Sequence, residues 1–411
     1  MNRKILIIVE NLPVPFDTRV WKEALALKAA GYETSVLCPK GKGYEKGYEL
    51  LDGVHIYRHP MPAEGNSALG YVWEYGLAFF WELVYAWRIF LSRGFHVIQG
   101  CNPPDNIFLV ALPFKLFGVR YIFDHHDANP ELYFSKYERK DLFWKIQVWL
   151  ERLTYRTSDV VIATNESYKQ LAIVRGRIRP SDVFVVRNGP DISKFKPVAA
   201  KPELKHEKPY LVGYVGNMSV QDGLDILIDA ALHIRDVGRN DIHFTCVGGG
   251  PGLASLKELV REKGLEDTVT FTGRVPDREL IEILSTADVC VNPDKPCEMN
   301  DISTMIKVTE YMALGKPIVQ FDLKEGRFTA GDASLYSSCN NGDLATDFAQ
   351  RILQLIDHPE ERRRMGEIGK RRVEEQLAWE FSIGQLIAAY ERVFEKRSGR
   401  IGGPVNVTKP L

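Results

Sequence analysis

The chain has 411 residues, and its charges nearly cancel: 53 Lys and Arg stand against 54 Asp and Glu, a formal net charge of −1. This length suits two or three domains, and a hydrophobic content of 45% excludes a disordered chain. The charge balance disfavours a nucleic-acid-coating protein, which would carry a basic excess. The six cysteines lack CxxC spacing, so the sequence predicts reduced thiols in a cytosolic protein rather than disulfides or a zinc site.

The first half of the chain alternates apolar strands with helical patterns. Its basic start precedes only a short apolar run before Glu10, which predicts a first strand rather than a signal peptide. Strands rich in Val and Ile on both faces indicate a parallel sheet covered by helices on both sides. The predicted strands are 4–10, 34–39, 54–59, 96–100, 119–124, 159–165 and 182–189.

Residues 68–92 are crowded with Trp, Tyr and Phe and could be mistaken for a membrane span. Glu74 and Glu82 interrupt the run, and a carboxylate at the bilayer centre costs a few kcal/mol. The pattern therefore predicts a helix packed on the sheet. The alternative is a helix whose aromatic face, with the apolar segment 107–118, touches a membrane surface or a lipid-linked substrate.

A second series of strands follows a polar linker that contains prolines. Its predicted strands are 210–216, 243–250, 268–273, 288–293, 317–322 and 334–338. The fold class is therefore α/β, with two doubly wound Rossmann-like domains that face a cleft. The expected organisation is a first domain over 1–196, a linker over 197–209, a second domain over 210–375, a helix over 376–396 that returns to the first domain, and a tail over 397–411.

The motif FDHHD, residues 123–127, directly follows a predicted strand, where functional loops of this fold lie. Asp124 and Asp127 flank His125 and His126, so either imidazole can gain a carboxylate partner that orients it and raises its pKa. Adjacent residues point to different sides, so we expect one histidine to face the cleft. The alternative is a pair of structural histidines. A metal site is weakly supported, because the sequence shows no further ligand cluster.

Two glycine-bearing turns, at 212–223 and 247–252, each follow a strand and precede a helix. Backbone amides in such turns stabilise an anionic phosphate at the helix N-terminus. Neither turn matches GxGxxG with a suitably placed acidic residue, nor GxxxxGK[ST]. A dinucleotide-dependent dehydrogenase and a P-loop NTPase are therefore disfavoured.

The segment 292–326 contains a predicted helix over 303–314, with Ser303 as its N-cap. Lys307 and Glu310 then lie on one side of that helix, and a surface ion pair would explain the spacing. The apolar residues that follow predict a largely interior helix instead. A glutamate there needs a partner such as two ribose hydroxyls, and Lys307 could meet a diphosphate.

These features together resemble a bacterial family 4 glycosyltransferase of GT-B architecture, over the chain to about residue 395. The motifs that carry the resemblance are EYMALGKPIV, VGGGPG followed by FTGRVP, RNGPD and FDHHD. The resemblance implies a cytoplasmic enzyme that transfers a sugar from a nucleoside diphosphate to an acceptor with retention, without a metal ion or other cofactor. It also implies that Glu310 binds the ribose, that the loop at Gly273, Arg274 and Val275 reads the base, and that His126 lies near the transferred sugar.

The sequence departs from the family pattern at several positions. The first glutamate of the E-x7-E motif is replaced by Ile302, and we expect Asp301 to take its role. Asn217 and Asp222 stand where the family has a phosphate-binding Arg and Lys, so Arg187 and Lys307 are the expected cations. The complete assignment gives catalysis to His126, Asp301, Lys307 and Arg187; donor binding to Gly216, Asn217, Gly249, Arg274, Val275, Ser303, Thr304 and Glu310; and the acceptor side to Asp17, Arg19 and Asp127, where Asp17 and Arg19 alternatively form a structural pair.

The expected partners are a UDP- or GDP-sugar and a glycan or lipid-linked acceptor, in cell-surface polysaccharide synthesis at the inner face of the membrane. Two alternatives remain open. A sugar-nucleotide epimerase would act without an acceptor. A non-catalytic nucleotide-sugar-binding scaffold would bind the nucleotide without transfer, and Ile302, Asn217 and Asp222 keep that alternative open.

Overall fold

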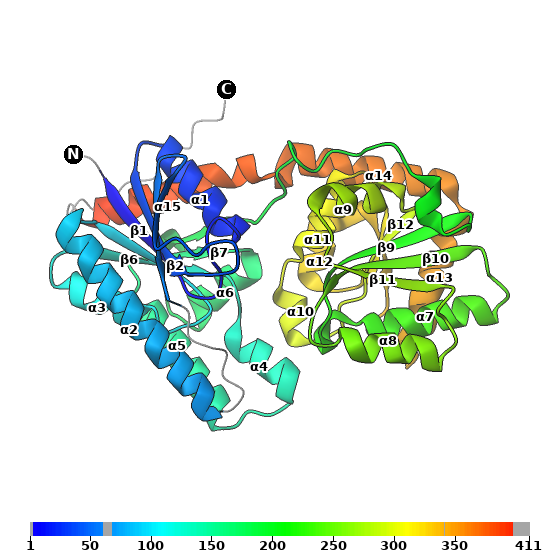
Figure 1. The fold of residues 1–411 in the computed structure, drawn as a ribbon, viewed down its shortest axis with the longest axis horizontal. Helices are drawn as coiled ribbons and strands as arrows, with labels where there is room; N and C mark the ends of the chain where they lie inside the picture. Colours follow the sequence, from blue (N-terminus) through cyan, green and yellow to red (C-terminus); the bar gives the residue numbers. More distant parts are fainter. Residues whose placement is uncertain (1–2, 61–67, 341, 398–411) are drawn as a thin grey trace. The chain divides into compact units, whose positions relative to one another are not determined.

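The computed structural model describes residues 3–60, 68–340 and 342–397. The chain divides into two compact units (Figure 1). Unit 1 comprises the residues up to Asn188 and again those from Ser382, and unit 2 comprises Gly189–Phe381. The first division thus lies at Asn188, where the sequence suggested residue 196, and the segment expected to be a linker, 197–209, belongs to unit 2.

Unit 1 is built on an eight-stranded sheet in the order β3-β4-β2-β1-β5-β6-β7-β8. The strands are β1 Lys4–Val9, β2 Glu33–Pro39, β3 Tyr48–Leu51, β4 Val54–His59, β5 Val97–Cys101, β6 Arg120–His125, β7 Val160–Ala163 and β8 Val183–Val185. All neighbours are parallel except β3 and β4. Every predicted strand of this half is present, and the antiparallel edge strand β3 was not predicted, because its sequence YELL is short and half exposed.

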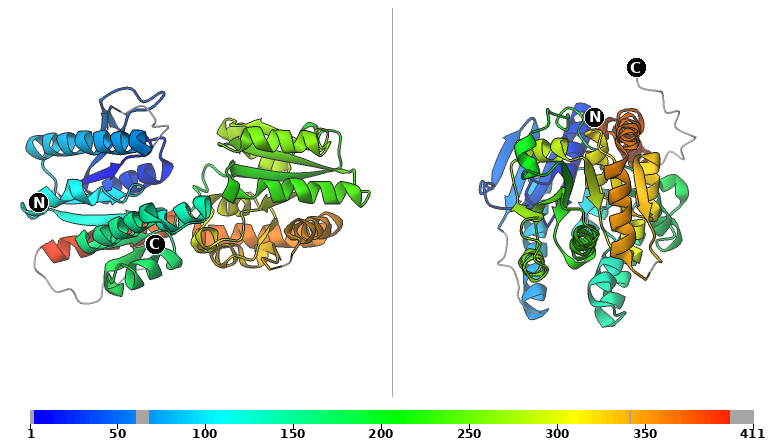
Figure 2. Two further views of the ribbon diagram at one scale, coloured as in Figure 1. Left: turned by 90° about the horizontal axis from the view of Figure 1, so that it is seen from below. Right: turned by 90° about the vertical axis from the view of Figure 1, so that its right-hand side faces the viewer.

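Helices cover both faces of this sheet (Figure 2). They are α1 Thr18–Ala29, α2 Ala68–Ser92, α3 Phe108–Lys115, α4 Asn129–Tyr137, α5 Leu142–Thr157, α6 Glu166–Val174 and the part of α15 from Ser382 onward. Because both faces are covered, the central strands are apolar throughout: Ile5 to Val9 of β1 are at most 1% exposed.

Unit 2 has a six-stranded parallel sheet in the order β11-β10-β9-β12-β13-β14. Its strands are β9 Tyr210–Asn217, β10 Ile242–Gly249, β11 Val269–Gly273, β12 Val289–Asn292, β13 Ile318–Phe321 and β14 Ser334–Ser337. Its helices are α7 Leu224–Asp236, α8 Leu253–Glu262, α9 Asp277–Thr286, α10 Glu298–Ile302, α11 Ile306–Ala313, α12 Lys324–Ala330, α13 Leu344–Asp357 and α14 Pro359–Arg372. The prediction of two doubly wound domains is confirmed.

The last helix begins at Trp379, where the sequence suggested a helix over 376–396. Helix α14 ends at Arg372 and a π-helical turn spans Val373–Leu377. Ala378 is extended, and α15 Trp379–Arg397 then begins. From Ser382 this helix belongs to unit 1.

The aromatic segment forms α2, which contacts β2, β4 and α3, so the prediction of a helix packed on the sheet is confirmed. Its Glu82 is fully buried, and burial next to Glu10 raises the pKa of that carboxyl well above its usual range. Glu74 lies among residues whose side chains are not described. Within the described part of the chain, no helix is both long and apolar enough to cross a membrane.

Candidate active site

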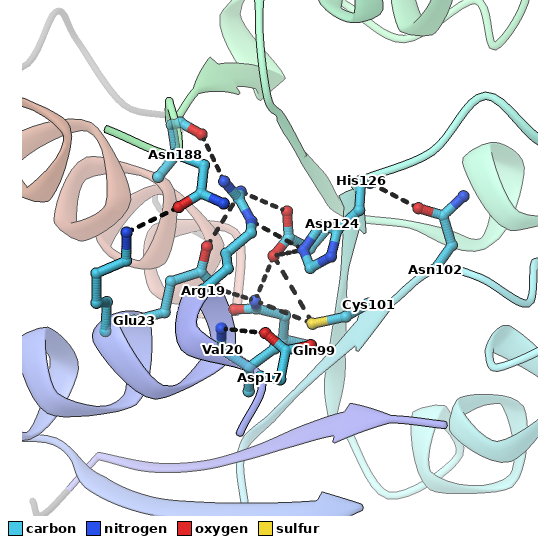
Figure 3. Close-up of polar contacts among 12 residues, drawn as sticks. Asp17, Arg19, Val20, Glu23, Gln99, Cys101, Asn102, Asp124, His126 and Asn188 are labelled. Atoms are coloured by element: carbon cyan, nitrogen blue, oxygen red, sulfur yellow. Dashed lines mark hydrogen bonds and ion pairs between the residues drawn. The ribbon is translucent and has the colours of Figure 1, made fainter. Parts of the chain in front are cut away.

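In unit 1, polar side chains gather where β5 and β6 end beside the start of α1 (Figure 3). Helix α1 supplies Arg19 and Glu23 one turn apart, β5 supplies Gln99, and β6 with its following loop supplies Asp124 and His126. Parallel strands bring their carboxyl ends to the same edge of a sheet, which places these groups together.

Arg19 contacts three other charged or titratable side chains of this cluster. Its Nη2 lies 3.0 Å from Asp124 Oδ1 and 3.1 Å from Glu23 Oε1, and its Nε donates to His126 Nε2 at 2.9 Å. Its Nη1 donates to the carbonyl of Val186 at 3.0 Å. The residue is 5% exposed and its donors are directed at protein groups, so the acceptor-facing role assigned to Arg19 is wrong.

Asp17 does not pair with Arg19 either. It is the N-cap of α1, and its Oδ1 accepts a hydrogen bond from the amide of Val20 at 3.0 Å. This bond satisfies an amide at the helix start, which explains an aspartate at that position. Capping of α1 therefore accounts for Asp17 without a contact to the acceptor substrate.

The two adjacent histidines have different environments, as the sequence suggested. His126 Nε2 lies 2.8 Å from Asp124 Oδ2, and although burial would lower the pKa of His126, the Asp124 carboxylate raises it above its usual value. His125 is fully buried, contacts the hydroxyl of Tyr155 at 2.9 Å and stacks on Tyr168. Burial and the charge of Arg175 lower the pKa of His125 to about 3, so it is a neutral structural residue.

The pKa values of the two carboxyls in this cluster are shifted in opposite directions. Burial opposes the ionisation of Asp124, but Arg19 and His126 together hold its pKa below the usual range. Burial and the nearby Asp124 raise the pKa of Glu23 to about 8. Asp124 is therefore the anion of the cluster at neutral pH, whereas burial favours the protonated form of Glu23.

Asn102 fixes the loop that carries His126. Its Oδ1 accepts from the amides of His126 at 2.6 Å and Asp127 at 3.2 Å, and its Nδ2 donates to the carbonyl of Asp127 at 2.7 Å. Asp127 is half-buried, and burial raises its pKa. The sequence pattern gave no signal for Asn102, Gln99 or Glu23, because residues far apart in the chain meet only once the sheet has formed.

Cys101, Asp124 and His126 have ligand atoms within 4.8 Å of one another, a spacing that suits a metal ion. Cys101 supplies the further ligand that the sequence did not reveal. However, the guanidinium of Arg19 bonds both Asp124 and His126, and a cation at that point would be repelled by it. We therefore assign these residues to the Arg19 cluster.

In unit 2, the carboxyl ends of β9 and β10 approach closely. Gly216 pairs with Gly248 across the two strands, and a Cβ at Gly248 would lie 1.9 Å from the carbonyl oxygen of Gly216. Both have positive φ, at 156° and 128°. Glycine is therefore required here, at a strand end of the kind where backbone amides can meet a bound phosphate.

Lys307 lies beside this glycine turn. Its Nζ is 3.5 Å from where a Cβ of Gly216 would be, 2.8 Å from Asp294 Oδ1 and 4.8 Å from the centre of the Tyr214 ring. Asp294 is 1% exposed, and its partner is a lysine whose side chain is 10% exposed. The structure thus brings together two of the predicted donor-site residues, Gly216 and Lys307, and pairs the lysine with a buried carboxylate.

The segment between α10 and α11 differs from the prediction. Ser303 is not the N-cap of a helix: it closes α10, where its hydroxyl donates to the carbonyl of Met299 at 2.7 Å, and α11 begins at Ile306. Thr304 Oγ1 contacts Glu325 at 3.5 Å. Asp301 Oδ1 accepts from the amide of Lys324 at 2.8 Å, so one oxygen of the expected sugar-binding carboxylate holds the start of α12.

Three of the other predicted donor-site residues lie at the same edge of the unit 2 sheet. Gly249 ends β10, and Arg274 and Val275 follow β11, with Arg274 exposed. Glu310 is half-buried on α11, whose buried residues confirm a largely interior helix.

Asn217 and Asp222 serve the turn after β9. The Nδ2 of Asn217 donates to Ser219 Oγ at 2.8 Å, and Asp222 Oδ2 accepts from the amide of Ser219 at 2.8 Å. Each of these two side chains thus has a local structural partner. Arg187, the other expected cation, follows β8 in unit 1.

Two doubly wound units, one with a histidine held by a buried aspartate after β6 and the other with a glycine turn beside a lysine, are the elements of the GT-B class of enzymes. Residues 17–189 match the glycosyl transferase 4-like domain, and residues 209–358 match the glycosyl transferases group 1 family. The two matches together span most of the chain, which therefore belongs to the family 4-like glycosyltransferases of GT-B fold.

Similar proteins are consistent with this membership. An alpha-D-kanosaminyltransferase from Streptomyces kanamyceticus is 29% identical over 328 residues, which cover 75% of this chain and 80% of that protein. Among solved structures, sucrose-phosphate synthase from Thermosynechococcus elongatus has a TM-score of 0.79 at 20% identity and covers 96% of this chain and 100% of its own. Anabaena HepE in complex with UDP and glucose has a TM-score of 0.70 at 15% identity, with 97% and 100% coverage.

Proposed function

We propose that the chain transfers a sugar from a UDP- or GDP-sugar to a glycan or lipid-linked acceptor, with retention at the anomeric carbon, without a metal ion or other cofactor, in cell-surface polysaccharide synthesis. The observation that carries this proposal is the unit 2 turn, where Gly216 and Gly248 meet at the ends of their strands beside Lys307. A glycine turn at a strand end suits a diphosphate, and the lysine supplies its counter-charge. That HepE has been solved with UDP supports UDP as one donor nucleotide.

Lys307 is expected to bind the donor diphosphate without leaving Asp294. A lysine ammonium has three N–H donors. In the described residues one is directed at Asp294 and one lies within 3.5 Å of the Tyr214 hydroxyl. The third is available for a phosphate oxygen, so the ion pair orients the ammonium and keeps a cation in the site before the donor arrives.

The remaining donor contacts are proposed from the family pattern. Glu310 is proposed to bind the ribose hydroxyls, the backbone after Gly273 to contact the base, and Arg187 to supply a further positive charge. His126 is proposed to hydrogen-bond the transferred sugar, with Asp124 holding its ring. The acceptor hydroxyl then attacks from the face of the leaving group, and a phosphate oxygen takes its proton.

A peripheral contact with the inner face of the membrane is proposed for the α2 and α3 surface. Phe80 and Leu91 on α2 are 53% and 79% exposed, and Leu116 and Phe117 at the end of α3 are 88% and 59% exposed. Exposed aromatic and aliphatic side chains on neighbouring helices favour the boundary between headgroups and acyl chains. Such a contact would bring the enzyme to a lipid-linked acceptor.

The test is an incubation of the full chain with a panel of UDP- and GDP-sugars, with and without lipid-linked glycan acceptors, and in EDTA. Acceptor-dependent release of the nucleoside diphosphate, with a product of retained configuration by NMR, is the expected result. A changed sugar still attached to its nucleotide would establish the epimerase alternative. Tight nucleotide binding with no turnover for any pair would establish the scaffold and refute the proposal.

A further inference from the structure

A buried carboxamide connects the His126 cluster to the last helix of the chain. Gln99 on β5 is 0% exposed, and its Nε2 donates to Glu23 Oε2 at 2.7 Å and to Asp124 Oδ2 at 2.8 Å. Its Oε1 accepts from the hydroxyl of Tyr390 on α15 at 2.5 Å. Figure 3 shows Gln99 beside Asp124 and Glu23.

The hydrogen-bond partners determine which way this carboxamide points. Both N–H groups of Gln99 meet carboxyl oxygens, and its oxygen meets a hydroxyl donor. The reversed amide would place its oxygen against the Asp124 carboxylate at a fully buried position. Tyr390 is fully buried and donates only to Gln99 among the described residues. The hydroxyl therefore helps to hold the amide that holds Asp124.

Charge counting gives Glu23 a second role. The positive charge of Arg19 balances the negative charge of Asp124, which lies 3.0 Å away. The net charge of the cluster then depends on the protonation of His126 and Glu23. A buried cluster is least costly when its net charge is zero. That requires one proton on either His126 or Glu23, because two protons leave an excess positive charge and none leaves an excess negative charge. Both groups contact Arg19 and are sensitive to each other's charge.

Two other buried groups of the cluster do not supply that proton. Cys101 on β5 and Tyr390 on α15 stay protonated, because burial raises the pKa of each well above its usual range. Two further carboxyls lie nearby: Asp17, the N-cap of α1, accepts from the amide of Val20, and Asp127 follows His126 in the loop and has its pKa raised by burial. Glu23 is the buried carboxyl that Gln99 links directly to Asp124.

We propose that Glu23, Gln99 and Tyr390 are positioning residues for His126: they hold the Asp124 carboxylate against the imidazole, and one proton is shared between Glu23 and His126. Helix α15 thereby helps to position His126 through Tyr390. The use of His126 in sugar transfer rests on the proposed function, whereas the network is a property of unit 1 and can be measured without substrate.

The test is a pH titration of the full chain by NMR with isotope-labelled histidine. The signal of His126 is assigned among the nine histidines by its loss in His126→Gln. A shared proton makes the titrations of the two groups interact, so the His126 signal is expected to move in two steps. Glu23→Gln cannot exchange a proton and is expected to reduce the titration to one step, with a lower pKa for His126.

Tyr390→Phe removes one hydroxyl and is expected to move the His126 midpoint by about half a pH unit or more, because the Asp124 carboxylate loses its fixed amide partner. Tyr155→Phe is the matched control: Tyr155 is equally buried, and its hydroxyl lies 2.9 Å from Nδ1 of the neighbouring His125. The control is expected to change the signal of His125 and leave that of His126 unchanged.

A one-step titration of His126 in the wild type, unchanged in Glu23→Gln, overturns the shared proton. If the His126 titration curve of Tyr390→Phe is the same as that of Tyr155→Phe, the role of α15 is overturned.

If the transfer assay succeeds, the pH profile of kcat for Glu23→Gln is expected to lose one limb while KM stays constant. A two-step titration in a protein that transfers no sugar supports the network and refutes the proposed function, so the two failures are distinguishable.

Discussion

Replacement of Glu23 by glutamine is expected to stabilise unit 1 at pH 8 and to be nearly neutral at pH 5. Glu23 is fully buried, and burial together with Asp124 raises the pKa of its carboxyl from 4.5 to about 8. A raised carboxyl pKa contributes stability that is complete below the pKa of the unfolded chain. That stability is lost as the pH rises toward the pKa of the folded protein. Glutamine has nearly the same shape and carries no charge to bury.

The magnitude follows from the two pKa values. One pH unit corresponds to about 1.36 kcal/mol of difference between the two protonation states. Between pH 4.5 and pH 8 the unfolded carboxyl releases its proton while the folded one, with a pKa of about 8, retains half of it. The free energy of unfolding of unit 1 therefore falls by about 4 kcal/mol from this group, and Glu23→Gln is expected to recover that amount.

The assay is urea unfolding of the full chain at pH 5, 6, 7 and 8, followed by tryptophan fluorescence. Of the seven tryptophans, six lie in unit 1 and only Trp379 lies in unit 2, so the signal reports mainly on unit 1. Glu166→Gln, at an exposed position on α6, is the control and is expected to follow the wild type at every pH. A difference between Glu23→Gln and wild type that does not change with pH would refute the reasoning, as would a less stable variant at pH 8.

Three further outcomes are expected. Lys307→Met should weaken UDP or GDP binding by about tenfold to a hundredfold, because one charge-assisted hydrogen bond is lost, whereas the control Lys295→Met in the same unit should not weaken it. If calorimetry gives equal affinities for Lys307→Met and the wild type, Lys307 is not part of the donor site. His126→Gln should keep nucleotide affinity and lower kcat by at least about a hundredfold, and unchanged turnover would exclude a catalytic role. Gly248→Ala should destabilise unit 2 by at least about 1–2 kcal/mol in thermal unfolding, because its Cβ would meet the Gly216 carbonyl at 1.9 Å; an unchanged midpoint would contradict that contact.

The two doubly wound sheets and the position of the FDHHD motif could be predicted from the sequence because they depend on local patterns. Continuous Val and Ile runs mark buried parallel strands, and a polar motif after such a run lies at the carboxyl edge. This was enough to place the FDHHD motif at that edge, whereas His126 was chosen over His125 through the family resemblance, and the structure separates the two.

The partners of these residues could not be predicted, because they are set by tertiary contacts between distant segments. Arg19 was expected either to pair with Asp17 or to face the acceptor, but the folded chain buries it against Asp124, more than a hundred residues later. Gln99 and Tyr390 are 291 residues apart. Ser303 has the residue type of an N-cap, yet it ends α10, because the chain leaves the helix there and begins α11 at Ile306.

The central claim, that unit 2 binds a sugar nucleotide, is tested most directly by calorimetric titration of UDP, GDP, ADP and NAD into the wild-type chain and into Glu310→Ala. The account predicts binding of UDP or GDP in preference to ADP and NAD, with an affinity about tenfold or more lower in Glu310→Ala, which removes the carboxylate proposed to bind the ribose. Absence of UDP and GDP binding, or a preference for NAD, would contradict it.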